Sequence, residues 1–280
     1  MIKTIAIAAA LTAPFFAAEA ASTYITNGGP GGVQATIADS GDYDSTAAIG
    51  LRYMGREYIN IDIPSAWYRF SVNGTDLTAQ YGSNPLGAVT FGAGPAATTS
   101  IAFGDWSFSQ TAFAATSNKI TYHLNVTNNT GKAVHGQWEV GFDPDQDGSG
   151  HNATLNTILG QHQASAVSAF GPLSRAKVTL MNDTSASATD VAAFINVGDC
   201  CSAVSANTAF GAFQLPGFSH LGDDSISLAY DFGVINAGQT VSVGYSVVFA
   251  PIPEPETYAL MLGGMGMVGF VARRRAAKRA

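Results

Sequence analysis

The clearest structural signal in this chain of 280 residues is the stretch ITYHLNVTNNTGKAVHGQWEVGF, residues 120–142. Apolar and polar residues alternate along both of its halves, which is the pattern of half-buried strands. The apolar face of the first half is formed by Ile120, Tyr122, Leu124 and Val126. The apolar face of the second half is formed by Val134, Trp138, Val140 and Phe142. Between them Asn128-Asn129-Thr130-Gly131 reads as a turn, because Asn and Gly tolerate positive φ, so the stretch predicts a β-hairpin.

The same alternation predicts a second hairpin near residue 237. Its strands cover residues 226–232 and 241–247, and Asn236-Ala237-Gly238 forms the turn. Further strands are expected at residues 50–63, 67–72, 88–91 and 106–113. The helical period occurs only around residues 153–159 and 189–194. Many short strands joined by Gly, Asn and Ser turns predict an all-β fold, a β-sandwich of the jelly-roll or immunoglobulin-like kind.

Composition and charge limit the classes of function. Of all residues 46% are hydrophobic, 12% are charged and 31 are glycines, which excludes a disordered chain and argues against a helical one. Residues 22–250 contain 7 basic and 17 acidic residues, a formal charge of −10. This acidic body repels phosphate backbones, so a nucleic-acid partner is disfavoured, whereas divalent cations suit it. No composition break divides residues 22–250, so we expect one β-sandwich domain, with a division into two halves near Ser117 as the alternative.

The first 21 residues have the order of a secretory signal peptide. Lys3 provides the positive charge, and residues 5–16 form an uncharged apolar segment. Ala18-Glu19-Ala20 then places small residues where a signal peptidase reads. The sequence therefore predicts export.

The two cysteines, Cys200 and Cys201, are adjacent in the sequence. They are interpreted as a pair of partly buried thiols or as a vicinal disulfide, and an intermolecular bridge stays open in an oxidising compartment. A metal or catalytic role needs further ligands at suitable spacing, and none is nearby in the sequence.

The last thirty residues, 251–280, differ from the body. They contain Pro253-Glu254-Pro255, an uncharged apolar segment at 258–272 and a basic cluster at 273–279. Proline favours extended structure, and the apolar segment is expected to form a single transmembrane helix. At about 1.5 Å per residue this helix covers roughly 23 Å, which is short against a hydrocarbon core of about 30 Å. The basic cluster predicts a cytoplasmic C-terminus and an exported body.

This tail resembles the PEP-CTERM sorting signal of Gram-negative bacteria. The residues that carry the resemblance are Pro253, Glu254, Pro255, Arg273, Arg274 and Arg275. The resemblance implies that an exosortase recognises the tail while its helix anchors the protein in the inner membrane, and that the mature protein then reaches the cell surface or the outside. It also implies a link to exopolysaccharide and biofilm. The same tail carries the label ice-binding protein C-terminal domain, which is no evidence of ice binding.

A candidate metal site follows the stretch of residues 120–142. Asp143, Asp145 and Asp147 alternate before Gly148, and such carboxylates can wrap Ca²⁺. Position twelve of an EF-hand loop would fall on Thr154 instead of a glutamate, and the flanks are strand-like, so this is no EF-hand. The sequence predicts a looser Ca²⁺ loop that also uses the carbonyl of Ser149, with a solvated acidic turn as the alternative.

Aromatic side chains offer a second candidate site. Trp67 and Tyr68 are adjacent, so within a strand they point to opposite faces, and one of them is expected to be exposed. An exposed ring can stack on a sugar, and Trp67 and Tyr68 are therefore a candidate polysaccharide-binding pair. Trp138 falls in register with Val134, Val140 and Phe142 in the alternating pattern and is therefore expected in the core.

The search for catalytic residues finds none. Ser219 and His220 lie in a segment that resembles a nucleophile elbow only loosely, because Leu221 stands where a second glycine belongs. The sequence therefore predicts a non-enzymatic surface or matrix protein. The alternatives are a polysaccharide-binding β-sandwich module with a Ca²⁺ site and, third, a secreted hydrolase.

Overall fold

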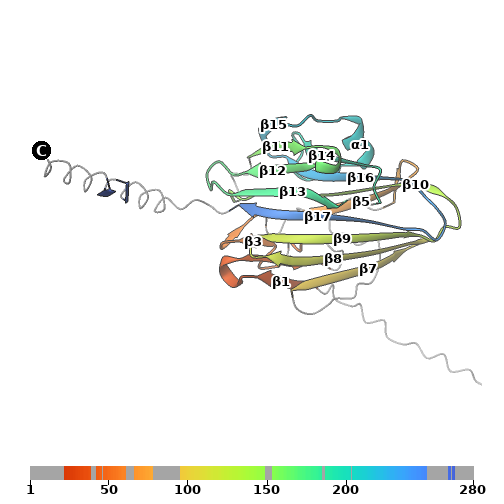
Figure 1. Ribbon diagram of the computed structural model, residues 1–280, viewed down its shortest axis with the longest axis horizontal. Coiled ribbons are helices and arrows are strands. Elements are labelled where there is room, and N and C mark those ends of the chain that lie inside the picture. The colour runs from red at the N-terminus through yellow and green to blue at the C-terminus, as the bar shows by residue number, and fades with distance from the viewer. Residues whose placement is uncertain are drawn as a thin grey trace, which may run out of the picture.

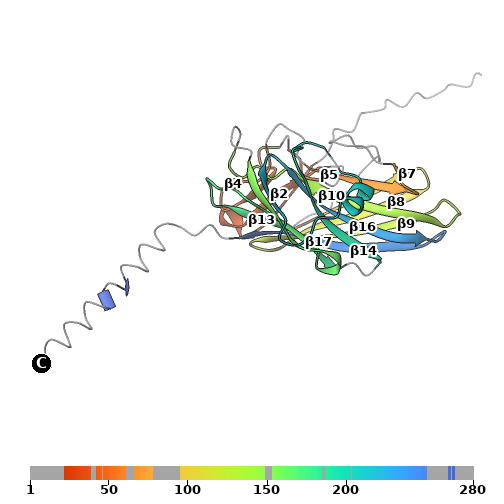
Figure 2. The same ribbon diagram turned by 90° about the horizontal axis from the view of Figure 1, so that it is seen from above.

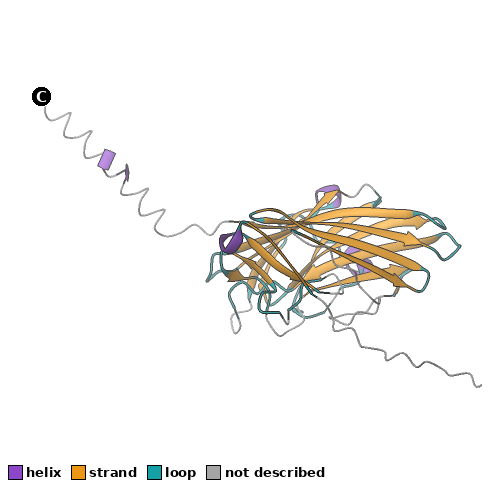
Figure 3. Ribbon diagram, turned by 90° about the horizontal axis from the view of Figure 1, so that it is seen from below, coloured by secondary structure: helices purple, strands orange, loops and turns teal. Residues whose placement is uncertain are grey.

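The protein is built almost entirely of β-strands, as its computed structural model shows (Figure 3). The residues that the structure describes are 22–38, 42–45, 47–60, 66–77, 95–148, 153–184, 187–202, 204–250, 264–265 and 267–268. The signal peptide, the strand expected at residues 88–91, the sorting residues 253–255 and 273–275, and Ser149 lie outside the described residues.

The strands form three antiparallel sheets. The large sheet has the order β15 (Ser219–Gly222), β11 (Thr154–Gly160), β12 (Ala166–Phe170), β13 (Lys177–Thr184), β17 (Thr240–Ala250), β9 (Lys119–Asn128), β8 (Trp106–Thr116) and β7 (Ala96–Phe103). The middle sheet has the order β14 (Asp190–Asn196), β16 (Ser225–Ile235), β10 (Val134–Phe142), β5 (Ala66–Val72) and β6 (Thr75–Asp76). The small sheet has the order β1 (Thr23–Asn27), β2 (Val33–Ile37), β3 (Leu51–Tyr53) and β4 (Arg56–Glu57).

The large and middle sheets pack face to face, which confirms the β-sandwich (Figures 1 and 2). Aromatic rings fill the space between them. Trp138 of β10 stacks on Tyr68 of β5 at 4.8 Å between ring centroids, and Phe108 of β8 lies 6.0 Å from Trp138 on the opposite sheet. Phe70 contacts Phe108 at 5.1 Å. Rings of this size bury large apolar areas, so this cluster is a main source of the sandwich's stability.

The two predicted hairpins are wrong, although their strands and turns exist. β9 pairs with β17 and β8, whereas β10 pairs with β16 and β5. β16 and β17 likewise belong to different sheets. Each turn therefore carries the chain from one sheet to the other, so that two apolar faces meet across the sandwich rather than lying side by side in one sheet.

Asn128 ties these two crossing turns together. Its side-chain Nδ2 donates to the carbonyls of Lys132 at 2.7 Å and Ile235 at 2.9 Å, and its Oδ1 accepts from Thr130 N at 2.9 Å. Its backbone N–H donates to Gln239 O at 3.0 Å. The asparagine that signals a turn in the sequence thus holds a sheet-to-sheet crossing, because a buried amide satisfies several backbone groups at once.

The small sheet closes one end of the sandwich. Tyr53 of β3 stacks on Phe249 of β17 at 5.4 Å, and Tyr58 meets the same ring edge-on at 4.8 Å. Tyr43 contacts Tyr122 of β9 at 6.2 Å. These contacts join the N-terminal strands to the same hydrophobic core as the rest of the body.

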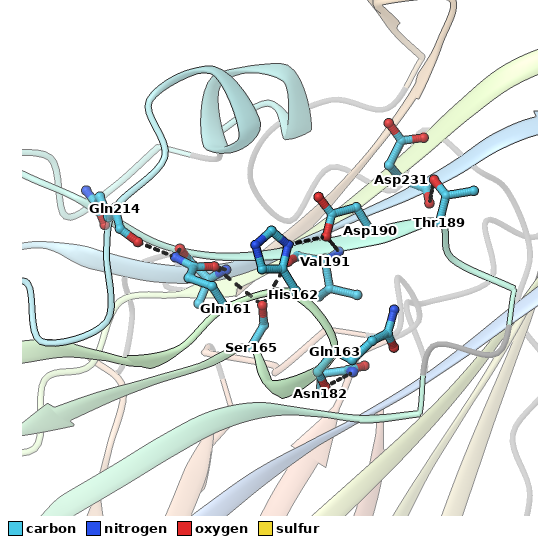
Figure 4. Close-up of polar contacts among 11 residues, drawn as sticks. Gln161, His162, Gln163, Ser165, Asn182, Thr189, Asp190, Val191, Gln214 and Asp231 are labelled. Carbon is cyan, nitrogen blue, oxygen red and sulfur yellow. Dashed lines mark hydrogen bonds and ion pairs between the residues drawn. The ribbon is translucent and has the colours of Figure 1, made fainter.

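Two glutamines cover the edge strand β14 (Figure 4). Gln161 Nε2 donates a hydrogen bond to Ala193 O, and Gln161 Oε1 accepts one from Ala193 N, both at 2.8 Å. Gln214 makes the same pair with Ile195, again at 2.8 Å each way. Each side-chain amide takes the place of a peptide unit of a neighbouring strand. The edge is therefore closed against pairing with another chain.

Helices are few in the described part of the chain. α1 (Ala206–Gly211) is one turn and a half long, and η1 (Gly29–Gly31) and η2 (His162–Ala164) are single 3₁₀ turns. The helices indicated by the helical period around residues 153–159 and 189–194 are wrong, since these segments form β11 and β14. Among the described residues, no helix has the length and apolar character needed to cross a bilayer.

Candidate metal centre

Three carboxylates converge where the middle sheet meets the edge of the large sheet. Asp143 and Asp145 directly follow β10, and Asp223 lies in the turn between β15 and β16. They come together because β10 and β16 are paired, with Phe142 opposite Ile226. One carboxylate oxygen from each of Asp143, Asp145 and Asp223 lies within 4.8 Å of the others.

Two of these carboxylates are buried, and most of their oxygens lack a hydrogen bond of good geometry. Asp143 and Asp145 are each 3% exposed. Oδ1 of Asp143 and both side-chain oxygens of Asp145 have no such bond. Burial raises the pKa of Asp143, and the negative charges of Asp145 and Asp223 add to that rise. Burial and the charge of Asp223 also raise the pKa of Asp145, and hydrogen bonds with Asp143 and Asn60 offset that rise only in part. An unpaired buried carboxylate costs several kcal/mol, so these oxygens call for a cation or protons.

The spacing suits a Ca²⁺ ion. Ca²⁺–oxygen distances are about 2.3–2.6 Å, so two oxygens on one ion lie at most about 5 Å apart. Only oxygen atoms are offered, which favours a hard cation over a transition metal. Ca²⁺ takes about six to eight ligands, and since Asp223 is exposed, water or a ligand can complete the shell from outside.

The structure brings two of the four predicted ligands together and places a third elsewhere. Asp143 and Asp145 belong to the cluster, whereas Asp147 points to a different turn. Its oxygens accept Leu173 N at 2.9 Å and Ser174 N at 2.8 Å. Asp147 is satisfied by these backbone donors and does not belong to the cluster of Asp143, Asp145 and Asp223.

Asp223 is the member of this carboxylate cluster that sequence reasoning missed. It lies 80 positions from Asp143, and only the pairing of β10 with β16 brings them together. The available signal was two adjacent acidic residues, Asp223 and Asp224, just before a predicted strand. That signal was not used because the strand was paired with the wrong partner.

Behind the cluster, Asp224 holds a histidine. Asp224 is 1% exposed and accepts Gly198 N at 2.7 Å and Asn156 Nδ2 at 3.2 Å. Its Oδ2 also binds His220 Nδ1 at 2.7 Å. In the tautomer that suits this bond, Nδ1 carries the proton and Nε2 is the basic nitrogen. Ser219, the neighbour of His220, instead bonds Thr157 at 3.0 Å, so the two do not form a nucleophile–base pair.

Cys200 and Cys201 form a vicinal disulfide beside the same cluster. Both sulfurs lie within 4.8 Å of a carboxylate oxygen of Asp143. A thiolate binds metals and a disulfide does not, so the bonded sulfurs offer no ligand to a cation held by these carboxylates. The vicinal-disulfide interpretation of the pair is confirmed.

The predicted aromatic pair is buried. Trp67 is 2% exposed and Tyr68 7%, so the expectation that one ring is exposed is wrong. The two residues do point to opposite faces, but both faces of the middle sheet are covered. Trp67 Nε1 donates to Glu139 Oε1 at 3.3 Å on one side, and Tyr68 stacks on Trp138 on the other.

A second exposed histidine–aspartate pair serves as a comparison. His162 Nδ1 lies 2.8 Å from Asp190 Oδ1 (Figure 4). The His162 ring also stacks on Phe213, with 5.4 Å between the ring centroids. The His162 side chain is 65% exposed, and its partner Asp190 is 40% exposed. In contrast to Asp224, Asp190 does not adjoin a group of carboxylates that could hold a metal among the described residues.

The tail resemblance is confirmed. A family model of the PEP-CTERM protein-sorting motif matches residues 251–275, which include Pro253-Glu254-Pro255 and Arg273 to Arg275. The chain therefore carries an exosortase-type sorting signal, which implies export and processing by an exosortase. No curated protein matches the sequence.

Solved structures resemble the body in fold. A putative aldose 1-epimerase from Escherichia coli K12 aligns with a TM-score of 0.50 and 11% identity, over 83% of this chain and 99% of that chain. A galactose mutarotase related enzyme from Lactobacillus acidophilus aligns with a TM-score of 0.45 and 9% identity, over 83% of this chain and 98% of that chain. Heparan sulfate lyase HepC from Pedobacter heparinus aligns with a TM-score of 0.44 and 8% identity, over 80% of this chain but only 34% of its own length.

The likeness to the putative aldose 1-epimerase corrects one prediction. The expectation of a non-enzymatic body rested on finding no catalytic constellation along the sequence. The body has the fold of a putative epimerase, so that expectation is overturned. At 11% identity the likeness itself shows the fold alone.

Proposed function

We propose that this chain is an exosortase-sorted extracellular protein whose β-sandwich body binds Ca²⁺ through Asp143, Asp145 and Asp223, and through that ion binds anionic polysaccharide. The observation that carries the proposal is the trio of carboxylates, two of them buried with unpartnered oxygens. The sorting motif supports delivery to the cell surface.

The body's charge explains why a cation is needed. With a formal charge of −10 over residues 22–250, the body repels a polymer of uronic acids. A Ca²⁺ ion held at the exposed Asp223 has coordination positions open to solvent, and the carboxylate of a sugar acid can fill them. Binding therefore depends on Ca²⁺.

Calcium titration tests the site. We expect Ca²⁺ to stabilise the purified body, by about 2.7 kcal/mol at a concentration 100 times the dissociation constant. Asp145→Asn should abolish both the heat of binding and the shift in melting temperature, while its apo form still folds because a buried charge is removed. The matched control is Asp105→Asn, an exposed residue in the turn between β7 and β8. An identical response of wild type and Asp145→Asn would remove this site from consideration.

Co-sedimentation with uronate-rich polysaccharide tests the ligand. Wild type should sediment with the polymer in Ca²⁺ and stay in solution in EGTA, and Asp145→Asn should stay in solution in both. If wild type sediments with the polymer equally well in EGTA, the idea that a Ca²⁺ ion bridges protein and polymer is contradicted. If wild type does not sediment with the polymer in Ca²⁺, the polysaccharide is not the ligand and only the metal site remains.

A second candidate function is an enzyme that cleaves the same polymer. The observation that favours it is His220, whose Nδ1 is held by Asp224 and whose side chain is 39% exposed. With the sugar carboxylate neutralised by the cation, Nε2 of His220 can take the proton on the carbon beside that carboxylate. The C–O bond to the neighbouring sugar then breaks, a C=C bond forms, and the leaving oxygen takes a proton from water.

Product formation distinguishes the two candidates. An eliminating enzyme releases conjugated unsaturated sugars, which are followed by ultraviolet absorbance during incubation with polyuronates. His220→Gln should reduce the rate by about 10²–10⁴-fold, the usual contribution of a general base. His162→Gln, which removes the comparison pair, should leave the rate unchanged. No absorbance change with wild type in Ca²⁺ leaves the binding function alone.

A further inference from the structure

Asp143 faces two groups of potential ligands. On one side are the oxygens of Asp145 and Asp223, and on the other are the sulfurs of Cys200 and Cys201, each group within 4.8 Å of an Asp143 oxygen. Asp143 is 3% exposed and its Oδ1 has no hydrogen-bond partner. A buried carboxylate with one unpartnered oxygen therefore adjoins two sulfur atoms as well as two carboxylates.

The cysteine loop is anchored independently of its disulfide. Gly198 N donates to Asp224 Oδ1 at 2.7 Å, and Cys201 N donates to Asp199 Oδ1 at 3.0 Å. Ser225 N donates to Asp199 O at 3.1 Å, which fixes the loop to the start of β16. Because these bonds involve backbone groups and carboxylates only, cleaving the S–S bond leaves the sulfurs beside Asp143. Both cysteines are half-buried, so a small reductant and a metal ion can reach them.

We propose that reduction of the Cys200–Cys201 disulfide creates a second metal site, formed by Asp143 and the two thiolates, for a thiophilic divalent cation such as Zn²⁺. Two thiolates and one carboxylate are three ligands of a tetrahedral zinc site, with water in the fourth position. Soft sulfur ligands select such a cation over Ca²⁺, which prefers oxygen. Since both sites use Asp143, the two cations compete, and the redox state of the cysteines selects the metal.

The chemistry balances with one external reductant. A phosphine attacks the disulfide, the S–S bond takes up two electrons, and the phosphine leaves as its oxide with oxygen from water. The two sulfurs take protons and become thiols. When Zn²⁺ binds, these thiols release their protons, so the affinity for zinc rises with pH.

The proposal is tested with the full body, oxidised or reduced with a phosphine, in titrations with Zn²⁺ and Ca²⁺. Reduction should raise the zinc affinity at least about 100-fold, because it supplies two direct ligands. Removing an outer-shell partner alone already lowers metal affinity by about 10–100-fold, and a direct ligand contributes more. Zinc should also slow alkylation of both thiols, whereas Ca²⁺ should not. Saturating Ca²⁺ should raise the apparent dissociation constant of zinc. Near-ultraviolet circular dichroism checks that the reduced body remains folded, and loss of that signal would overturn the proposal.

Variants separate this site from the proposed Ca²⁺ site. The double variant Cys200→Ser, Cys201→Ser should lose reduction-dependent zinc binding and keep Ca²⁺ binding. Asp145→Asn should lose Ca²⁺ binding and keep reduction-dependent zinc binding. Asp143→Asn should weaken both. If reduced wild type binds zinc no better than the double serine variant, the zinc site does not exist. If Ca²⁺ binding alone fails, the calcium function is lost and the zinc site stands.

Discussion

Replacing Trp138 with alanine is expected to lower the free energy of unfolding by about 3–5 kcal/mol, the usual loss for a buried tryptophan. Trp138 is 2% exposed and lies at the centre of the sandwich, stacked on Tyr68 at 4.8 Å and close to Phe108 of the opposite sheet at 6.0 Å. Its removal leaves a cavity lined by rings from both sheets, which cannot all move inward together. Urea denaturation followed by circular dichroism measures the loss.

Two variants give this prediction its controls. The indole Nε1 of Trp138 has no hydrogen-bond partner, so Trp138→Phe keeps a ring and removes an unsatisfied donor. We expect Trp138→Phe to cost only about 1–2 kcal/mol. Val234→Ala, at a side chain 60% exposed, should change stability by less than about 0.5 kcal/mol. A loss for Trp138→Ala no larger than that for Val234→Ala would contradict the central place of this ring.

Local sequence patterns predicted which residues form strands and which face the core. The alternation at residues 120–142 placed Tyr122, Leu124 and Trp138 correctly inside, because alternation depends only on the two faces of a strand. It could not predict the partner of each strand. A turn with Asn and Gly fits a hairpin and a sheet-to-sheet crossing equally well, and the outcome depended on long-range pairing, such as that of β9 with β17.

The same limit explains the candidate site. Asp143 and Asp145 follow a strand end and were found from their spacing, whereas Asp223 needed the pairing of β10 with β16. Asp147 looked equivalent in sequence, but the backbone N–H groups of Leu173 and Ser174 attract its carboxylate. Trp67 looked available for a sugar because alternation cannot show that the outer face of a sheet is also covered.

Glu139 should make the stability of the body fall as pH rises. It lies on the outer face of β10 and is 0% exposed, and burial raises the pKa of its carboxyl to about 8. Trp67, Arg69 and Ser227 lower the pKa only in part. The folded chain therefore holds a proton that the unfolded chain releases near pH 4.5. The stability that this proton provides is complete below pH 4.5 and is lost as pH rises through about 8.

Glu139→Gln isolates this effect, because glutamine has nearly the shape of the protonated acid. At about 1.4 kcal/mol per pKa unit, wild type should lose roughly 3–5 kcal/mol more than Glu139→Gln between pH 4.5 and pH 9. Asp143 and Asp145 titrate in the same window, but they do so in both proteins, so the difference between the two curves belongs to Glu139. Urea denaturation in EGTA at pH 4.5, 7 and 9 measures it, with Asp105→Asn as a variant that should follow wild type. Parallel curves for wild type and Glu139→Gln would mean that Glu139 is ionised in the folded body at neutral pH. In that case its charge must be neutralised across the sheet by Arg69, its register partner on β5.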